Sequence, residues 1–120
     1  MARLLFHCTH GRDDPERAIV PFIAANVAAA SGQEAVVVLT VEGAWLCKQG
    51  EVERVEAEGF PRLAELVDSL LEAGGELWGC SACTTPRGIT EADLRPGAKI
   101  VGAAAIVEAI AAGAVPVALG

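Results

Sequence analysis

Short apolar runs alternate along the chain with longer segments in which apolar residues recur every three or four positions. The short runs are typical of β-strands, and the longer spacing is typical of amphipathic helices. The predicted strands are Arg3 to Cys8, Glu34 to Thr40, Glu76 to Gly79, Lys99 to Val101 and Ala114 to Leu119. The predicted helices are Pro15 to Ala30, Phe60 to Ala73 and Ala103 to Ala112. Strands and helices therefore alternate along the chain.

This alternation predicts the fold class. Strands separated by helical segments form right-handed parallel crossovers. The core of the second strand, 35–39, is apolar throughout, as expected where helices cover both faces of a sheet. We therefore expect an α/β fold, a three-layer αβα domain with a mostly parallel five-stranded sheet, in a single domain over residues 1–120.

Two segments carry further expectations. The segment Ser81 to Gly97 is interrupted by Pro86 and Pro96 and is predicted to be mostly loop, with a helix start of one or two turns at 90–93. Pro116 lies within the last strand, and because proline cannot donate to a strand ladder, it favours an edge position or a bulge for this strand.

Charge and hydropathy narrow the classes of function. The 9 Lys and Arg residues against 16 Asp and Glu give a net charge of −7, which argues against a nucleic-acid partner. No apolar run reaches the roughly 18 residues that a membrane span needs. The first apolar run is too short for a signal peptide, so we expect a cytoplasmic protein. The hydrophobic share of 52% favours a sheet buried on both faces, contacts between subunits, or both.

The carboxyl ends of the predicted strands carry the reactive residue types. Functional groups gather at this edge of open parallel sheets. His10 follows the first strand, and Cys80 follows the third. A cysteine reacts as its thiolate, which a nearby cation or backbone N–H groups stabilise. Arg87 is the candidate cation for Cys80, and His10 is a candidate for acid–base help or substrate contact, whereas His7 inside an apolar strand is expected to be a core side chain.

Cys83 completes a C-x-x-C motif with Cys80, which leaves several chemistries open. The pair is a redox dithiol, half of a metal site, or a chance spacing. A zinc site normally shows a second matching pair, so we expect neither a metal nor a cofactor. A thioredoxin-like dithiol usually opens a helix, whereas Pro86 follows this pair within a few residues.

The segment from Trp78 to Cys83, followed by Arg87-Gly88-Ile89, resembles the cysteine-bearing loop of the DsrE/DsrF-like family. In that loop an Arg-Gly pair follows the sulfur-carrying cysteine at this spacing. Three further segments, 10–18, 41–46 and 100–104, are similar to other parts of the family pattern, so the resemblance covers essentially the whole chain.

The resemblance implies a sulfur-relay subunit that assembles into homotrimers or homohexamers. Cys80 would carry sulfur as a persulfide between a sulfur donor protein and an acceptor protein, with Arg87 and loop N–H groups stabilising the anion. Cys83 can resolve such a persulfide into a disulfide. The alternatives are a dithiol–disulfide oxidoreductase that uses Cys80 and Cys83, an oligomeric binding module without catalysis, and a metal-binding protein.

Overall fold

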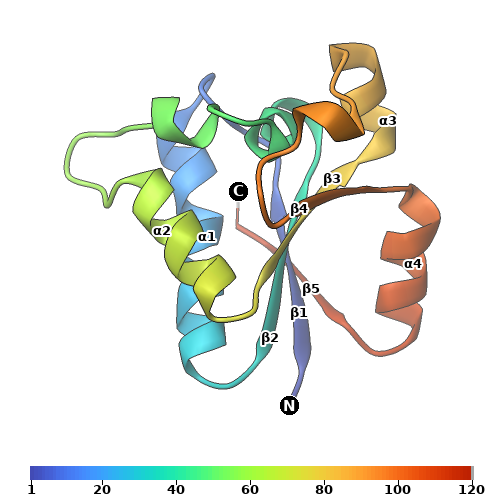
Figure 1. Cartoon of the computed structure of the whole chain (residues 1–120). Helices are drawn as coiled ribbons and strands as arrows, with labels where there is room; N and C mark the ends of the chain where they lie inside the picture. Colours follow the sequence, from blue (N-terminus) through green and yellow to red (C-terminus); the bar gives the residue numbers. More distant parts are fainter. Residues whose placement is uncertain (120) are drawn as a thin grey trace.

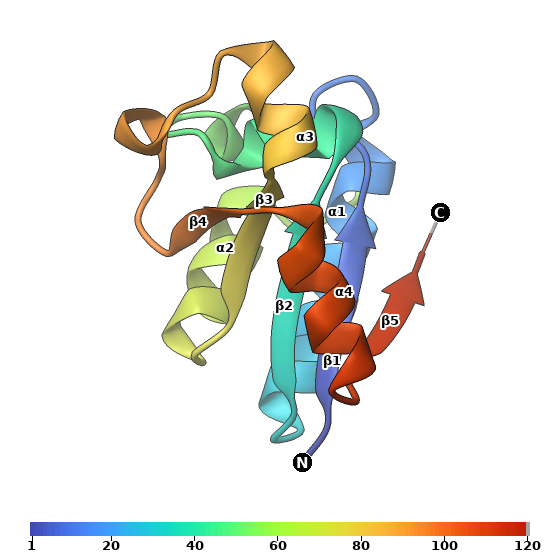
Figure 2. The same cartoon turned by 90° about the vertical axis from the view of Figure 1, so that its right-hand side faces the viewer.

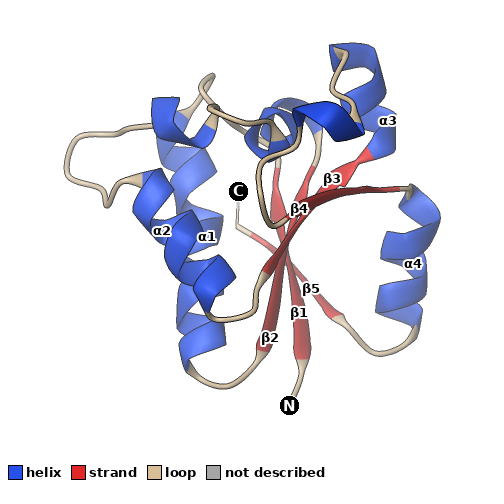
Figure 3. Cartoon of the chain, viewed as in Figure 1, coloured by secondary structure: helices blue, strands red, loops and turns tan. Residues whose placement is uncertain are grey.

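Five parallel strands form the central sheet of the computed structural model, which describes residues 1–119 (Figure 1; Figure 3). Their order across the sheet is β4-β3-β2-β1-β5, and each neighbouring pair is parallel. The strands are β1 (Arg3–Cys8), β2 (Glu34–Leu39), β3 (Glu76–Cys80), β4 (Ala98–Val101) and β5 (Val115–Ala118). The predicted α/β fold is confirmed, and β5 with Pro116 lies at an edge as expected.

Helices cover both faces of this sheet. The helices α1 (Pro15–Ala30) and α2 (Leu63–Glu72) lie on one face, and α4 (Ala103–Ala111) lies on the other (Figure 1; Figure 2). The start of α1 is capped, because the Asp14 side chain accepts the backbone N–H of Arg17 and Pro15 occupies the first turn. The two faces are called here the α1/α2 face and the α4 face.

The α1/α2 face holds the larger core. Every second residue of a strand points to this face, and the residues between them point to the other face, as the pleat of a strand requires. Its members include Phe6, Cys8, Phe22, Ala35, Val37, Leu39, Cys47, Leu63, Val67, Leu70 and Leu77. Dense burial of this kind supplies most of the hydrophobic stabilisation of a small domain.

The α4 face holds a smaller core. Its buried members are Leu5, Val36, Val38, Trp78, Ala109 and Ala114. A hollow of about 230 Å³ lies between the sheet and α4 and is lined by Leu5, His7, Val38, Thr40, Ile106 and Ile110. One helix therefore covers this face incompletely.

The segment between β3 and β4 differs from the prediction. Residues 81–87 are helical, as α3 (Ser81–Thr84) followed by the 3₁₀ turn η3 (Thr85–Arg87), and a second turn, η4, spans Glu91–Asp93. The expectation of a loop is therefore wrong over 81–87. Pro86 lies at the beginning of η3, where a helical turn needs no backbone N–H from it.

The start of α2 also differs. The helix begins at Leu63, three residues after the predicted Phe60. The residue before Pro61 is disfavoured in helical conformation, and Arg62 precedes the helix with extended backbone. The helix therefore begins only after the proline.

No helix within residues 1–119 is both long and apolar enough to cross a membrane.

Candidate functional site

Cys80 lies at the carboxyl end of β3 and is the N-cap residue of α3. A Cβ atom added at the preceding Gly79 would lie 2.9 Å from Sγ of Cys47, so position 79 faces the α1/α2 core. Strand alternation then turns Cys80 to the α4 face. Cys80 is 6% exposed, so it is shielded but lies at the end of a strand rather than in either core cluster.

Cys83, in the first turn of α3, is partly exposed and contacts a second segment of the chain. The backbone N–H of Val41 donates a hydrogen bond to its Sγ, with a distance of 3.1 Å from N to Sγ. Val41 has a φ of 52°, a left-handed conformation that a β-branched residue rarely adopts. Backbone strain of this kind persists only where the surrounding structure imposes it. In this position the strained backbone directs the N–H of Val41 at the Cys83 thiol.

Arg87 and Glu42 join the same two segments. Glu42 lies in the 3₁₀ helix η1 (Val41–Cys47), and its Oε2 accepts Nε and Nη2 of Arg87 at 3.0 and 2.8 Å. Nη1 of Arg87 donates to the carbonyl oxygen of Cys83 at 3.1 Å. The hydrogen bonds of Arg87 therefore go to a carboxylate and to the backbone of the cysteine turn.

The two histidines lie in different surroundings. Nε2 of His7 is 2.6 Å from Oγ1 of Thr40, and both side chains line the hollow of the α4 face. His7 is exposed, because α4 leaves that part of the face uncovered, so the expectation of a core side chain is wrong. Nδ1 of His10 is 2.9 Å from Oδ2 of Asp13, and within residues 1–119 its ring makes no hydrogen bond to Cys80 or Cys83.

His7 and Thr40 share the face of Cys80. In the sheet register Leu39 pairs with Gly79, so Thr40 follows β2 where Cys80 ends β3. Three neighbouring strands therefore each place one of these residues at their carboxyl end and on the same face: His7, Thr40 and Cys80.

The other two cysteines are held as thiols. Burial raises the pKa of Cys8 to about 12 and the pKa of Cys47 to about 11. Sγ of Cys8 donates to the carbonyl of His10, and Sγ of Cys47 donates to the carbonyl of Ala44. Both are 0% exposed in the α1/α2 core, so the chemistry of a thiolate belongs to the C-x-x-C pair.

The part of the chain that the structure describes holds no group of three or more His, Cys, Asp or Glu side chains arranged to bind a metal ion. His7 and Cys8 point to opposite faces of the sheet, so neighbouring residues of β1 do not converge on one centre.

The sequence model of the DsrE/DsrF-like family matches residues 2–115. The chain belongs to this family. It is 35% identical over 95 residues to the uncharacterized protein MJ0760 of Methanocaldococcus jannaschii, an alignment that covers 79% of this chain and 34% of MJ0760. It is 29% identical over 85 residues to the uncharacterized protein MK0008 of Methanopyrus kandleri, covering 71% of this chain and 67% of MK0008. The aligned region thus spans about a third of the longer relative.

Two solved structures share the fold of this DsrE/DsrF-like chain. The E. coli protein YchN superimposes with a TM-score of 0.82 at 13% identity, over 99% of this chain and all of YchN. MTH1491 of Methanobacterium thermoautotrophicum, a protein of unknown function, superimposes with a TM-score of 0.77 at 20% identity, again over 99% and 100% of the two chains. The five-stranded α/β architecture is therefore that of DsrE-like proteins.

Sequence reasoning missed two contributors to the site of this family member. Strand alternation alone, counted from Trp78 and Leu5, would have placed His7 on the face of Cys80. The Val41 N–H has no comparable signal, since a valine in left-handed conformation is not expected from any sequence pattern.

Proposed function

We propose that this chain carries sulfur as a persulfide on Cys80 and passes it to the thiol of a partner protein. The observation that supports the proposal most directly is the position of Cys80, at the carboxyl end of the interior strand β3 and at the N-cap of α3. The backbone N–H groups that follow a helix N-cap favour a neighbouring anion, here a thiolate or a persulfide anion. Membership of a family with sulfur-relay members agrees with this chemistry.

The proposed reaction is balanced without an external oxidant. The Cys80 thiolate attacks the outer sulfur of a donor persulfide, the S–S bond of the donor breaks, and the donor leaves as a thiolate. Attack of an acceptor thiolate on the outer sulfur of Cys80–S–SH then forms the acceptor persulfide and restores the Cys80 thiolate. Each step exchanges one S–S bond for another.

Arg87 and His10 have supporting roles in this proposal. Arg87 holds the cysteine turn through the Cys83 carbonyl and Glu42, and its positive charge favours an anion in that turn. His10, whose ring lies against Asp13 at the same edge of the sheet, contacts the incoming partner.

A dithiol–disulfide oxidoreductase is the second candidate function. The observation in its favour is that the C-x-x-C pair opens a helix, since Cys80 caps α3 and Cys83 lies in its first turn. In the same site, attack of the Cys83 thiolate on the inner sulfur of Cys80–S–SH would give a Cys80–Cys83 disulfide and release HS⁻. The two functions differ in the product that accumulates.

Mass spectrometry of the intact protein separates them. Reduced wild type, Cys80→Ser and Cys83→Ser are exposed to a polysulfide donor, and Cys47→Ala serves as the control for a buried thiol. A gain of about 32 Da, one sulfur atom, in wild type and Cys83→Ser but not in Cys80→Ser supports the carrier. A loss of about 2 Da, two hydrogens, in wild type alone supports the oxidoreductase. Sulfur on Cys80→Ser to the same extent as on wild type would contradict the carrier proposal.

We also propose that copies of this chain associate as homotrimers or homohexamers through the α4 face. Two large apolar side chains of α4 are exposed there: Val107 is 64% and Ile110 39% exposed. Exposed apolar residues that lie together favour protein contacts. Light scattering should give a trimeric or hexameric mass for wild type and a lower mass for Val107→Asp, whereas a monomeric wild type would contradict the proposal.

A further inference from the structure

Arg95 is a buried cation with few partners. Its side chain is only 10% exposed, and within residues 1–119 the one hydrogen bond of its guanidinium runs from Nη2 to Oδ1 of Asp68 at 3.4 Å, which is long for a charged pair. Its Nε is buried and finds no hydrogen-bond partner in the described part of the chain. Buried charged groups are normally paired and hydrogen-bonded. Nε is sealed from solvent, so the part of the guanidinium that can still meet an acceptor is Nη1, which makes no hydrogen bond within residues 1–119.

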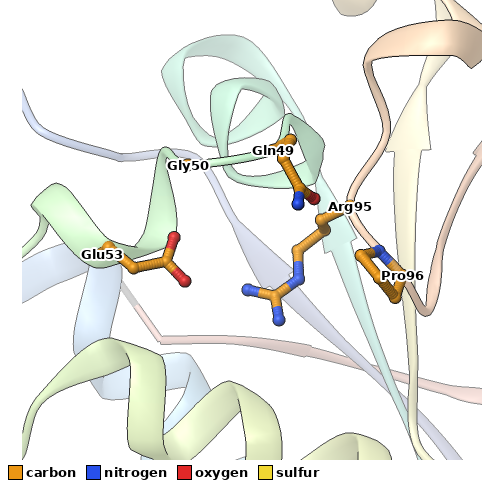
Figure 4. Close-up of a pocket in the computed structure, with 5 residues that line it drawn as sticks. All are labelled: Gln49, Gly50, Glu53, Arg95 and Pro96. Atoms are coloured by element: carbon orange, nitrogen blue, oxygen red, sulfur yellow. The ribbon is translucent and has the colours of Figure 1, made fainter.

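This guanidinium lines a pocket of about 230 Å³ together with Gln49, Gly50, Glu53 and Pro96 (Figure 4). The Glu53 carboxylate and the Arg95 guanidinium point toward each other across the pocket, yet no hydrogen bond or ion pair joins these two described side chains (Figure 4). Two opposite charges therefore face each other across an open space.

The walls of the pocket are held by the backbone. The N–H of Arg95 donates to the carbonyl of Cys47, and the N–H of Gln49 donates to the carbonyl of Asp93, at 2.9 and 2.8 Å. Lys48 and Leu94 form a bridge between the same two segments. These main-chain bonds hold the segment of Gln49 beside the segment of Arg95, so the backbone of this side of the pocket is fixed.

The charges around the pocket decide the class of ligand. Arg95 is the cation, and the carboxylates are Glu53 in the pocket wall and Asp68 beside the guanidinium on α2. A simple anion such as phosphate would gain one cation but face two carboxylates. A molecule with a carboxylate at one end and an ammonium group at the other matches both sides, because each of its charges meets an opposite one.

We infer that this pocket binds a small zwitterion of the α-amino acid class, with its carboxylate on Arg95 and its ammonium group on Glu53. Arg95 has a free donor for a carboxylate in Nη1, which makes no hydrogen bond within residues 1–119 and, unlike Nε, is not sealed from solvent. None of the lining residues belongs to the cysteine site, so this site is independent of the proposed sulfur transfer.

The test uses the full chain and compares L-alanine with its two halves. Propionate carries only the carboxylate, and ethylamine carries only the ammonium group. In ¹H–¹⁵N NMR titrations, L-alanine should shift the backbone amides of Gln49 and Gly50 saturably, and each half should bind at least about tenfold more weakly. Glu53→Gln and Arg95→Lys should each weaken binding of L-alanine by about tenfold or more, because each removes one charged contact or its geometry.

Arg62→Gln is the matched control, because Arg62 is paired with Glu56 on the surface and does not line the pocket. Its affinity for L-alanine should equal that of wild type. Glu53 is exposed, so Glu53→Gln tests the inference even if Arg95→Lys unfolds. The inference is overturned if L-alanine, glycine and L-serine all fail to give saturable shifts. Binding of propionate equal to that of L-alanine, and unchanged in Glu53→Gln, would also overturn it.

Discussion

The two faces of the sheet differ in what their side chains do. The α1/α2 face buries Cys8 and Cys47 under two helices, and burial raises the pKa of both thiols far above neutrality. The α4 face has one helix, a hollow and an exposed histidine, and Cys80 turns toward it at the end of β3. One face thus supplies stability and keeps its thiols inert, while the other has a hollow lined by His7 and Thr40 on the side to which Cys80 turns.

The largest expected effect is on stability, through matched truncations on the two faces. Ile19 is fully buried in the α1/α2 core, and Ile19→Ala should lower the free energy of unfolding by about 4 kcal/mol. Ile106 is only partly buried beside the hollow, so Ile106→Ala should cost about 1 kcal/mol. Urea denaturation measures both, and equal losses would show that the two faces contribute alike.

The next effect is on thiol reactivity. At pH 8 the thiolate fraction of Cys8, with a pKa of about 12, is about one in ten thousand. Iodoacetamide should therefore label Cys83 first under native conditions, while Cys8 and Cys47 react only when the protein unfolds. Peptide mass spectrometry over time follows each site. If Cys47 were labelled as fast as Cys83, the α1/α2 core would not protect its thiols from reaction, and the contrast between the two faces would be wrong.

A smaller effect is expected at Val41, whose backbone connects the two segments of the site. Glycine adopts a φ of 52° without steric cost, so Val41→Gly should raise the free energy of unfolding by about 0.5 kcal/mol. Val107→Gly is the matched control, because Val107 is exposed in the middle of α4 and glycine there should lower stability by about 1 kcal/mol. Urea denaturation that shows the same loss for both variants would mean that Val41 is not strained.

The smallest effect concerns pH and the cap of α1. The hydrogen bonds of Arg17, from its side chain and then its backbone, hold the pKa of Asp14 below its usual value. A depressed carboxyl pKa stabilises the folded state above the unfolded pKa near 4, and this gain is lost as the pH falls through the folded value. Asn caps helices as well as Asp but does not titrate. Asp14→Asn should therefore lose less stability than wild type between pH 7 and pH 3, as measured by urea midpoints.

Much of the fold was predictable because local signals and tertiary packing agree. Asp14 and Pro15 mark the start of α1, and the apolar run 35–39 marks a strand that is covered on both faces. Pro116 indicated the edge strand. Pro61 and Pro86 were harder to interpret. Pro61 delays the start of α2, whereas Pro86 lies at the beginning of the turn η3.

The candidate site was predictable in its location and less so in its contacts. The carboxyl edge follows from parallel topology, which brought His10, Cys80 and Cys83 to one end of the sheet. The Glu42 partner of Arg87 lies 45 positions away along the chain, and no local pattern pairs them. The bond from Val41 to Cys83 depends on a backbone conformation that only the packed structure imposes.

The close packing of Gly43 has a consequence for how this site can vary. A Cβ atom at this position would lie 2.2 Å from the carbonyl oxygen of Cys8, so any other residue would push η1 away from the end of β1. Val41 and Glu42 belong to that same helix, and they would move away from Cys83 and Arg87 together. The absence of a side chain at Gly43 therefore sets the spacing between η1 and the cysteine turn. Substitutions of Gly43 should damage the site even where the sheet remains folded.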